Sequence, residues 1–152
     1  MSADGYDASA RRPGRADVEA ALERVQRDCL AAGGQRSDVL VDDGEWGLRL
    51  VGTGDAAAEL QGSGAVLLVA VASAVSDSFV EQLGRAWPLC AQHDCALHPR
   101  LHEQVPTWWC QAADGIGHPV AAVGVLPASA VKPGTLVVDQ RTTRRRALRR
   151  RS

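Results

Sequence analysis

Cysteine and histidine recur as two pairs in the C-terminal half of this 152-residue chain, and this feature constrains its fold more than any other. Cys90 and His93 have two residues between them, a spacing over which two side chains can converge on one tetrahedral ion. Cys110 and His118 lie at the two ends of a predicted β-hairpin, whose paired strands would bring them together. Four Cys and His donors suit zinc and leave it no open coordination position. The pattern therefore predicts a structural zinc site.

Further donors lie close to these four in the sequence. His98, Cys95 and Asp114 could each replace a member of the set. The pattern is less specific than two short Cys-x-x-Cys loops, because seven residues separate Cys110 from His118. The alternative is that the cysteines are small buried apolar side chains and the histidines are solvated loop residues. A structural zinc contributes about 10 to 16 kcal/mol in small modules, so with zinc the C-terminal half would depend on the metal.

Polar segments at both ends leave residues 16–126 to build a single domain, a normal length for one. Residues 1–15 are predicted to be a disordered leader, and residues 127–152 a loose arm with an Arg-rich tail. Aromatic residues are scarce, so Val, Leu and Ala must form most of the core. The large aromatic side chains expected in that core are those of Trp46, Trp87, Trp108 and Trp109.

The pattern of apolar residues predicts an α+β fold that starts with a helix and a β-hairpin. The helix is predicted by apolar residues at helical spacing: Val18, Leu22, Val25 and Cys29. Asp17 is expected to cap its start, and Gly33-Gly34 to end it. The hairpin is predicted by Asp42, Asp43 and Gly44, which form a turn signal between two apolar runs. The following stretch, GTGDAA at 52–57, is predicted to be a flexible loop rather than a nucleotide-binding turn.

A long central helix and a second hairpin follow. One helix from Ala65 is favoured by apolar residues at four-three-four-four spacing: Leu68, Ala72, Val75, Phe79 and Leu83. This helix must end by Trp87, because Pro88 follows. Alternatively, VLLVAV is a strand ahead of a helix capped by Ser78 and Glu81. Residues 106–110 and 119–126 predict the two strands of the Cys/His-bearing hairpin, within a candidate zinc-binding segment at 87–126.

Charge is divided unevenly along the chain. Residues 1–140 hold all 18 acidic residues and 10 basic ones, a net charge of -8, whereas residues 141–152 hold seven arginines and no acid. Such a tail could bind nucleic acid through phosphate contacts, although like-charge runs are usually disordered and solvated. The residues that would make these contacts are Arg144, Arg145, Arg146, Arg149, Arg150 and Arg151.

The first fifteen residues contain no apolar run of the secretory type, which predicts a cytoplasmic protein. The apolar stretch at 65–75 is shorter than the roughly 20 residues that cross a bilayer, so no membrane association is expected. In a reducing compartment, the four cysteines are expected to be thiols or metal ligands rather than disulfides.

Four segments of this sequence carry a resemblance: WPLCAQH, ALHPRL, PTWWC and GHPVAAVGVL. Together they resemble a group of small, functionally uncharacterised actinobacterial proteins with a Trp-Pro-x-Cys-x-x-His segment, a Trp-x-Cys strand and a zinc-ribbon-like C-terminal half. The similarity covers about residues 16–126 and is most specific over 87–126. It implies a family pattern that includes His98 beside the four candidate ligands, but it implies no activity. Ala91 and Gln111 depart from the proline expected after each cysteine, which affects loop shape more than ligand identity.

These features predict a small cytoplasmic binding or interaction module with a structural zinc, an unknown protein partner and no catalysis. One alternative is a nucleic-acid accessory protein that acts through the Arg-rich tail. Another is a Cys-dependent enzyme, because Cys and His can act as nucleophile and base. However, an unactivated thiol, with a pKa near about 8.5, is mostly protonated at pH 7. The sequence identifies no group that would activate a cysteine thiol.

Overall fold

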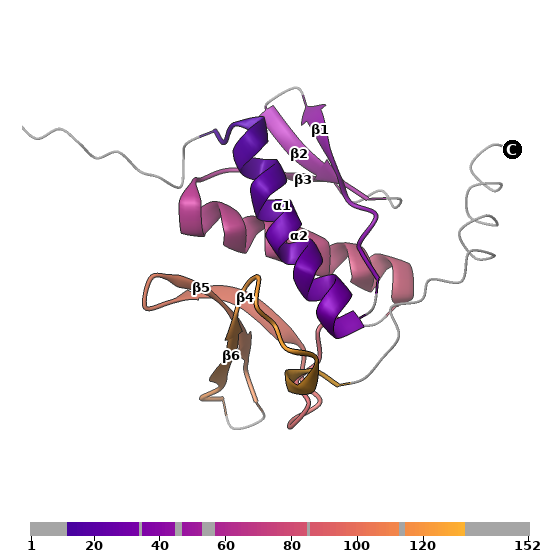
Figure 1. The fold of residues 1–152 in the computed structure, drawn as a ribbon, viewed down its shortest axis with the longest axis vertical. Helices are drawn as coiled ribbons and strands as arrows, with labels where there is room; N and C mark the ends of the chain where they lie inside the picture. The colour runs from indigo at the N-terminus through magenta and orange to yellow at the C-terminus, as the bar shows by residue number, and fades with distance from the viewer. Residues whose placement is uncertain are drawn as a thin grey trace, which may run out of the picture.

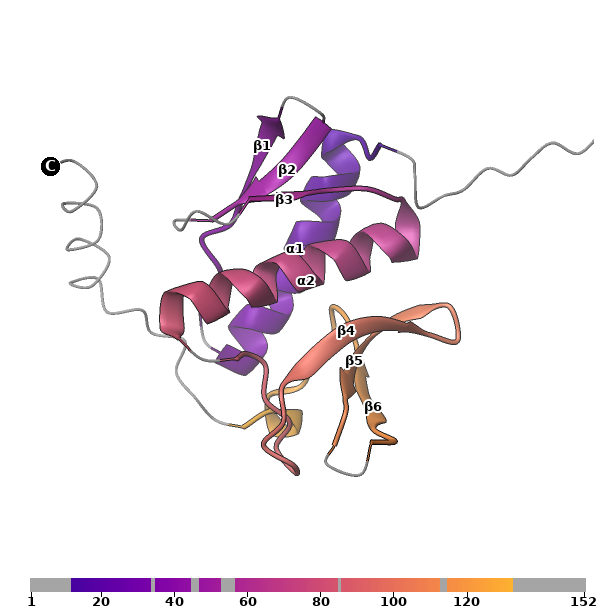
Figure 2. The same ribbon diagram turned by 180° about the vertical axis from the view of Figure 1, so that it is seen from behind.

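The computed structural model describes residues 12–33, 35–44, 47–52, 57–84, 86–112 and 115–132. These residues form the expected α+β fold, with two α-helices and two three-stranded antiparallel sheets. Helix α2 (Gly64–Leu83) lies between the two sheets, and α1 (Arg15–Gly33) crosses it (Figure 1). The view from behind shows the same layers (Figure 2). Most of the predicted leader and arm, residues 1–11 and 133–152, falls outside the described residues.

Helix α1 confirms the predicted apolar face. Val18, Val25 and Cys29 are fully buried, and Leu22 packs against the core from a half-buried position. The helix begins at Arg15, so the prediction that Asp17 caps it is wrong. Asp17 instead lies in the first turn, where its carboxylate interacts favourably with the positive end of the helix dipole.

Helix α2 confirms the prediction of one continuous central helix, which excludes the alternative strand VLLVAV at 66–71. It ends at Leu83, before the limit set by Pro88, because Gly84 adopts a left-handed conformation (φ 67°) and its N–H donates to the Val80 carbonyl at 2.9 Å. By length and composition alone α2 could cross a membrane, as core helices also could. In this fold it contacts α1, β4 and β5 and buries one face: Leu67, Leu68, Val71, Ala72, Val75, Ser78 and Phe79.

The first sheet has the order β1-β2-β3, with β1 at Leu40–Gly44, β2 at Gly47–Val51 and β3 at Ala57–Glu59. Gly44 pairs with Gly47, so the two strands are joined by residues 45 and 46, and the predicted turn at Asp42-Asp43-Gly44 is wrong. Most of the predicted loop at 52–57, residues 53–56, lies outside the described residues, and its last residue, Ala57, begins β3, a strand that the sequence did not indicate. Trp46 is outside the described residues.

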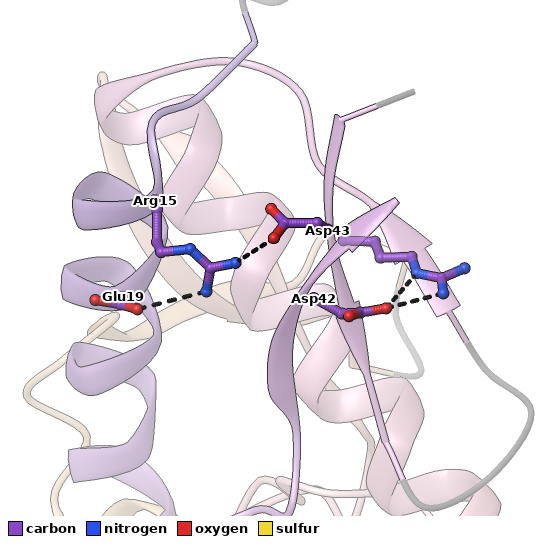
Figure 3. A network of polar contacts seen from close by, with 5 residues as sticks. Arg15, Glu19, Asp42 and Asp43 are labelled. Carbon is purple, nitrogen blue, oxygen red and sulfur yellow. Dashed lines mark hydrogen bonds and ion pairs between the residues drawn. The ribbon is translucent and has the colours of Figure 1, made fainter. Parts of the chain in front are cut away.

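The two aspartates of the mispredicted turn are strand residues that bind arginines (Figure 3). The Asp42 carboxylate accepts hydrogen bonds from its cross-strand partner Arg49 at 2.9 and 3.0 Å. Asp43 accepts one from Arg15 of α1 at 3.0 Å, and Arg15 also lies 3.7 Å from Glu19. These partners allow two adjacent acids to occupy an exposed strand, where sequence alone favours a turn.

The second sheet has the order β4-β5-β6, with β4 at Leu97–His102, β5 at Val105–Cys110 and β6 at His118–Ala122. Strands β5 and β6 confirm the predicted C-terminal hairpin, whereas β4 was not predicted. Trp108 of β5 is fully buried and meets Trp87 edge to face at 6.0 Å between ring centroids. Trp87 in turn contacts Phe79 of α2 at 5.1 Å, so aromatic packing joins the sheet to the helix.

Candidate metal centre

A tight loop ahead of β4 brings Cys90 and His93 together. Leu89 and Ala96 form an isolated antiparallel bridge, and the Asp94 N–H donates to the Cys90 carbonyl at 3.0 Å. Asp94 has a left-handed backbone (φ 55°), a conformation that Asp tolerates better than most residues. The chain therefore reverses within residues 90–94, and the side chains of Cys90 and His93 converge on one side of the turn, with Sγ and Nδ1 3.7 Å apart.

The second pair comes from the β5–β6 hairpin. Cys110 ends β5, His118 begins β6, and the two residues pair directly across the ladder. Gly117 precedes His118 with a left-handed backbone (φ 72°), and a Cβ at this position would lie 2.5 Å from the Cys110 carbonyl oxygen. Only glycine fits this approach of the two strands. The prediction that the hairpin brings Cys110 and His118 together is confirmed.

The four candidate ligand atoms form one compact cluster, all within 4.8 Å of one another. His93 Nδ1 lies 3.7 Å from the sulfur of Cys110 and 3.2 Å from Nε2 of His118. The same Nε2 lies 3.9 Å from the sulfur of Cys90. Two thiols and two imidazoles thus surround a common centre and could hold a metal ion.

Hydrogen bonding at His118 orients its ring for this role. Its Nδ1 lies 3.2 Å from the carbonyl oxygen of Pro119, which can only accept a hydrogen bond. A proton on Nδ1 leaves the lone pair of Nε2 directed at the cluster. A ligand histidine commonly donates its other N–H to such a carbonyl, which fixes the tautomer.

The cluster is buried on its sulfur side and open on its histidine side. Cys90 is 2% exposed and Cys110 is fully buried, whereas His93 is exposed. Desolvation raises the pKa of the Cys110 thiol, a hydrogen bond with the Ala112 backbone lowers it, and the nearby Cys90 and Cys95 sulfurs raise it. Without a cation, burial first and then the two neighbouring sulfurs disfavour the Cys110 thiolate, and a bound metal ion would supply the missing positive charge.

The additional donors named from the sequence do not join the cluster. His98 is an exposed residue of β4, placed opposite Trp109 in the ladder. Cys95 is half-buried, and its thiol lies 3.4 Å from the carbonyl oxygen of His93, at the edge of the site. Asp114 is outside the described residues, as are the tail arginines proposed to bind nucleic acid: Arg144, Arg145, Arg146, Arg149, Arg150 and Arg151.

The start of the predicted loose arm packs against the Cys90 loop. Residues 128–130 form a short 3-10 helix, and Val131, 3% exposed, bridges to Cys90. The Ala91 N–H donates to the Ala130 carbonyl at 3.2 Å, and the Lys132 N–H donates to the Leu89 carbonyl at 2.9 Å. Ordered structure thus continues past residue 126, because these backbone groups complete the hydrogen bonding of the loop.

One residue that positions the site was missed in the sequence. Asp28 of α1 is 1% exposed, and its carboxylate accepts hydrogen bonds from Trp108 Nε1 at 2.8 Å and from the backbone N–H groups of Gly124 and Leu126 at 2.7 and 2.9 Å. It thereby joins α1 to the strand that ends in Cys110. The signal was an acid between Val25 and Cys29 on the apolar face of a helix.

The chain matches no known protein-family model, and no curated protein or solved structure is significantly similar to it.

Proposed function

We propose that the protein is a small, non-catalytic interaction module whose C-terminal sheet is held by a structural zinc ion bound to Cys90, His93, Cys110 and His118. The observation that carries the proposal is the convergence of four soft or borderline donors within 4.8 Å. Thiolate and imidazole together suit zinc, whereas magnesium and calcium prefer oxygen ligands.

The separations between donors fit tetrahedral zinc. With Zn–S of about 2.3 Å and Zn–N of about 2.0 to 2.1 Å, tetrahedral angles require sulfur and nitrogen to be about 3.6 Å apart and the two nitrogens about 3.3 Å apart. Three of the four sulfur-to-nitrogen distances are 3.7, 3.7 and 3.9 Å, the two nitrogens are 3.2 Å apart, and no two of the four ligand atoms are more than 4.8 Å apart. The cluster therefore needs only small side-chain shifts to coordinate the ion.

The same geometry supports a structural rather than a catalytic role. Four protein ligands fill the zinc coordination sphere and leave no position for substrate or water. A Cys-dependent enzyme instead needs an accessible nucleophile, and Cys90 and Cys110 are buried. Each thiol also lies 3.7 Å from the same His93 nitrogen, an arrangement that suits a shared centre better than a nucleophile and its base.

An interaction role is supported by the outer face of β4 and β5. The Arg100 guanidinium lies 4.3 Å from the ring centre of Trp109, and the His102 ring lies 5.1 Å from the same indole. Val105, on the same face of the ladder as Trp109, is 47% exposed. Trp and Arg are enriched among residues that dominate protein interfaces.

Metal content of the purified full-length chain tests the proposal. We expect about one zinc per chain in the wild type and in Cys29→Ala, whose thiol lies on α1 outside the cluster. Cys90→Ser and Cys110→Ser should lose the zinc and melt at lower temperature. A wild-type protein that stays metal-free after growth in zinc-supplemented medium contradicts the proposal, as does a Cys90→Ser variant that keeps its full zinc content.

A further inference from the structure

A third sulfur borders the candidate metal centre without belonging to the four-atom cluster. Cys95 lies two residues after His93, and its thiol is 3.4 Å from the His93 carbonyl oxygen. Unlike the buried sulfurs of Cys90 and Cys110, Cys95 is partly exposed to solvent. A small oxidant can therefore reach Cys95 more readily than either buried cysteine.

Backbone pairing places Cys95 directly opposite one of the candidate ligands. The Leu97 N–H donates to the Pro88 carbonyl at 2.7 Å, and the Cys90 N–H donates to the Cys95 carbonyl at 2.8 Å. These two bonds enclose the bridge between Leu89 and Ala96, so Cys90 and Cys95 face each other at the next position of the ladder.

The distance across such a pair is close to that of a disulfide. Facing residues of an antiparallel pair have Cβ atoms about 4.5 to 5.5 Å apart on the same face of the ladder. A disulfide needs about 3.5 to 4.5 Å, so a shift of roughly 1 Å in the loop would allow the bond. Cys110 is a less suitable partner, because it lies in β5, where its backbone pairs with Leu97 and His118.

We infer that Cys95 is a peroxide-oxidation site, and that its oxidation forms a disulfide with Cys90 and releases the metal ion. The inference rests on the proposed function, since it requires Cys90 to be a zinc ligand in the reduced protein. It assigns Cys95 a role distinct from coordination.

The two-electron oxidant is one molecule of hydrogen peroxide. The Cys95 sulfur attacks one peroxide oxygen, the O–O bond breaks, and the products are a Cys95 sulfenic acid and one water. The Cys90 thiolate then attacks the sulfenic sulfur, the S–S bond forms, and hydroxide leaves. Two sulfurs have lost two electrons in total, and the peroxide has become water and hydroxide. Cys90 no longer binds the zinc ion, which dissociates from the three remaining ligands.

Treating the zinc-loaded full-length protein with hydrogen peroxide tests this inference. Zinc release is followed with a chromophoric chelator, and the disulfide is located by mass spectrometry after proteolysis. We expect zinc release from the wild type and from Cys29→Ala at equal rates, with Cys90 and Cys95 in one linked peptide, and release at least about tenfold slower from Cys95→Ser. Reduction with dithiothreitol in the presence of zinc should restore the metal content.

Two results would overturn the inference. One is zinc release from Cys95→Ser at the wild-type rate, which means that the oxidant attacks the ligands directly. The other is a wild-type disulfide between Cys90 and Cys110 instead of Cys95. If the purified wild type carries no zinc, the proposed function fails by itself. The linked-peptide measurement on the metal-free protein then still decides whether peroxide joins Cys95 to Cys90.

Discussion

At the residue scale, Gly117 should be required for the second ligand pair, and Gly115 provides a matched control. Both have a left-handed backbone, but a Cβ on Gly117 would lie 2.4 Å from Trp109 Nε1, whereas a Cβ on Gly115 meets nothing within 4 Å. Gly117→Ala should lower zinc affinity and destabilise the fold by more than about 2 kcal/mol. Gly115→Ala should cost only the conformational strain, about 1 kcal/mol. Chelator competition and urea unfolding measure both effects, and equal losses would contradict the geometry at Gly117.

Asp28 should contribute strongly to stability because three donors depend on its buried carboxylate. Replacing it with Asn puts an NH₂ group against an N–H donor, so we expect the free energy of unfolding to fall by about 3 kcal/mol. Asp42→Asn is the control, because that carboxylate is half-exposed in an ion pair and should contribute under about 1 kcal/mol. Urea unfolding compares the two variants. Similar small losses for both would show that Asp28 does not join α1 to the sheet.

The Cys29 thiol should make stability fall at high pH. Burial raises its pKa from 9.0 to about 12, so the folded protein keeps this proton at pH values where the unfolded chain has lost it. The stabilisation is complete below pH 9 and is lost as pH rises toward 12, by at most about 1.4 kcal/mol per pH unit. Cys29→Ala should therefore show a shallower decline in unfolding free energy between pH 9 and 11 than the wild type. Parallel curves for the two proteins would refute this effect.

At the scale of elements, regular apolar spacing predicted α1, α2 and the β5–β6 hairpin, because each buries a face with helical or alternating period. Strand β4 escaped prediction because Pro99 and Arg100 interrupt its pattern. Its position at the edge of the sheet explains why Pro99 is tolerated there. The turn of the first hairpin was misplaced because the partners of its two acids depend on the fold: Arg49 meets Asp42 only in this strand register, and Arg15 reaches Asp43 from α1.

The segment 127–132 should behave as part of the metal-bearing unit. A chain that ends at residue 126 loses two backbone hydrogen bonds to the Cys90 loop and the buried side chain of Val131. We expect it to unfold about 2 to 4 kcal/mol more easily than the full chain and to bind zinc more weakly. A chain that ends at residue 132 keeps these contacts and should match the full-length protein. Thermal melts and chelator competition on both truncations test this, and identical behaviour of the two would contradict it.

At the scale of the whole molecule, the four candidate ligands could be named from the sequence because local geometry brings each pair together. A two-residue spacing places Cys90 beside His93, and a hairpin places Cys110 beside His118. Sequence could not show that the pairs meet, because their meeting depends on the bridge between Leu89 and Ala96 and on packing of the sheet against α1 and α2. Nor could it show the contribution of Asp28, whose partners lie at least 80 residues away in the chain.

The proposed zinc ion joins the loop that carries Cys90 and His93 to the β5–β6 hairpin that carries Cys110 and His118. X-ray absorption at the zinc edge of the purified, full-length protein tests it most directly. We expect a four-coordinate ion with two sulfur ligands at about 2.3 Å and two nitrogen ligands at about 2.0 to 2.1 Å. A spectrum without sulfur, or with a shell of five or six oxygen and nitrogen atoms, would contradict it.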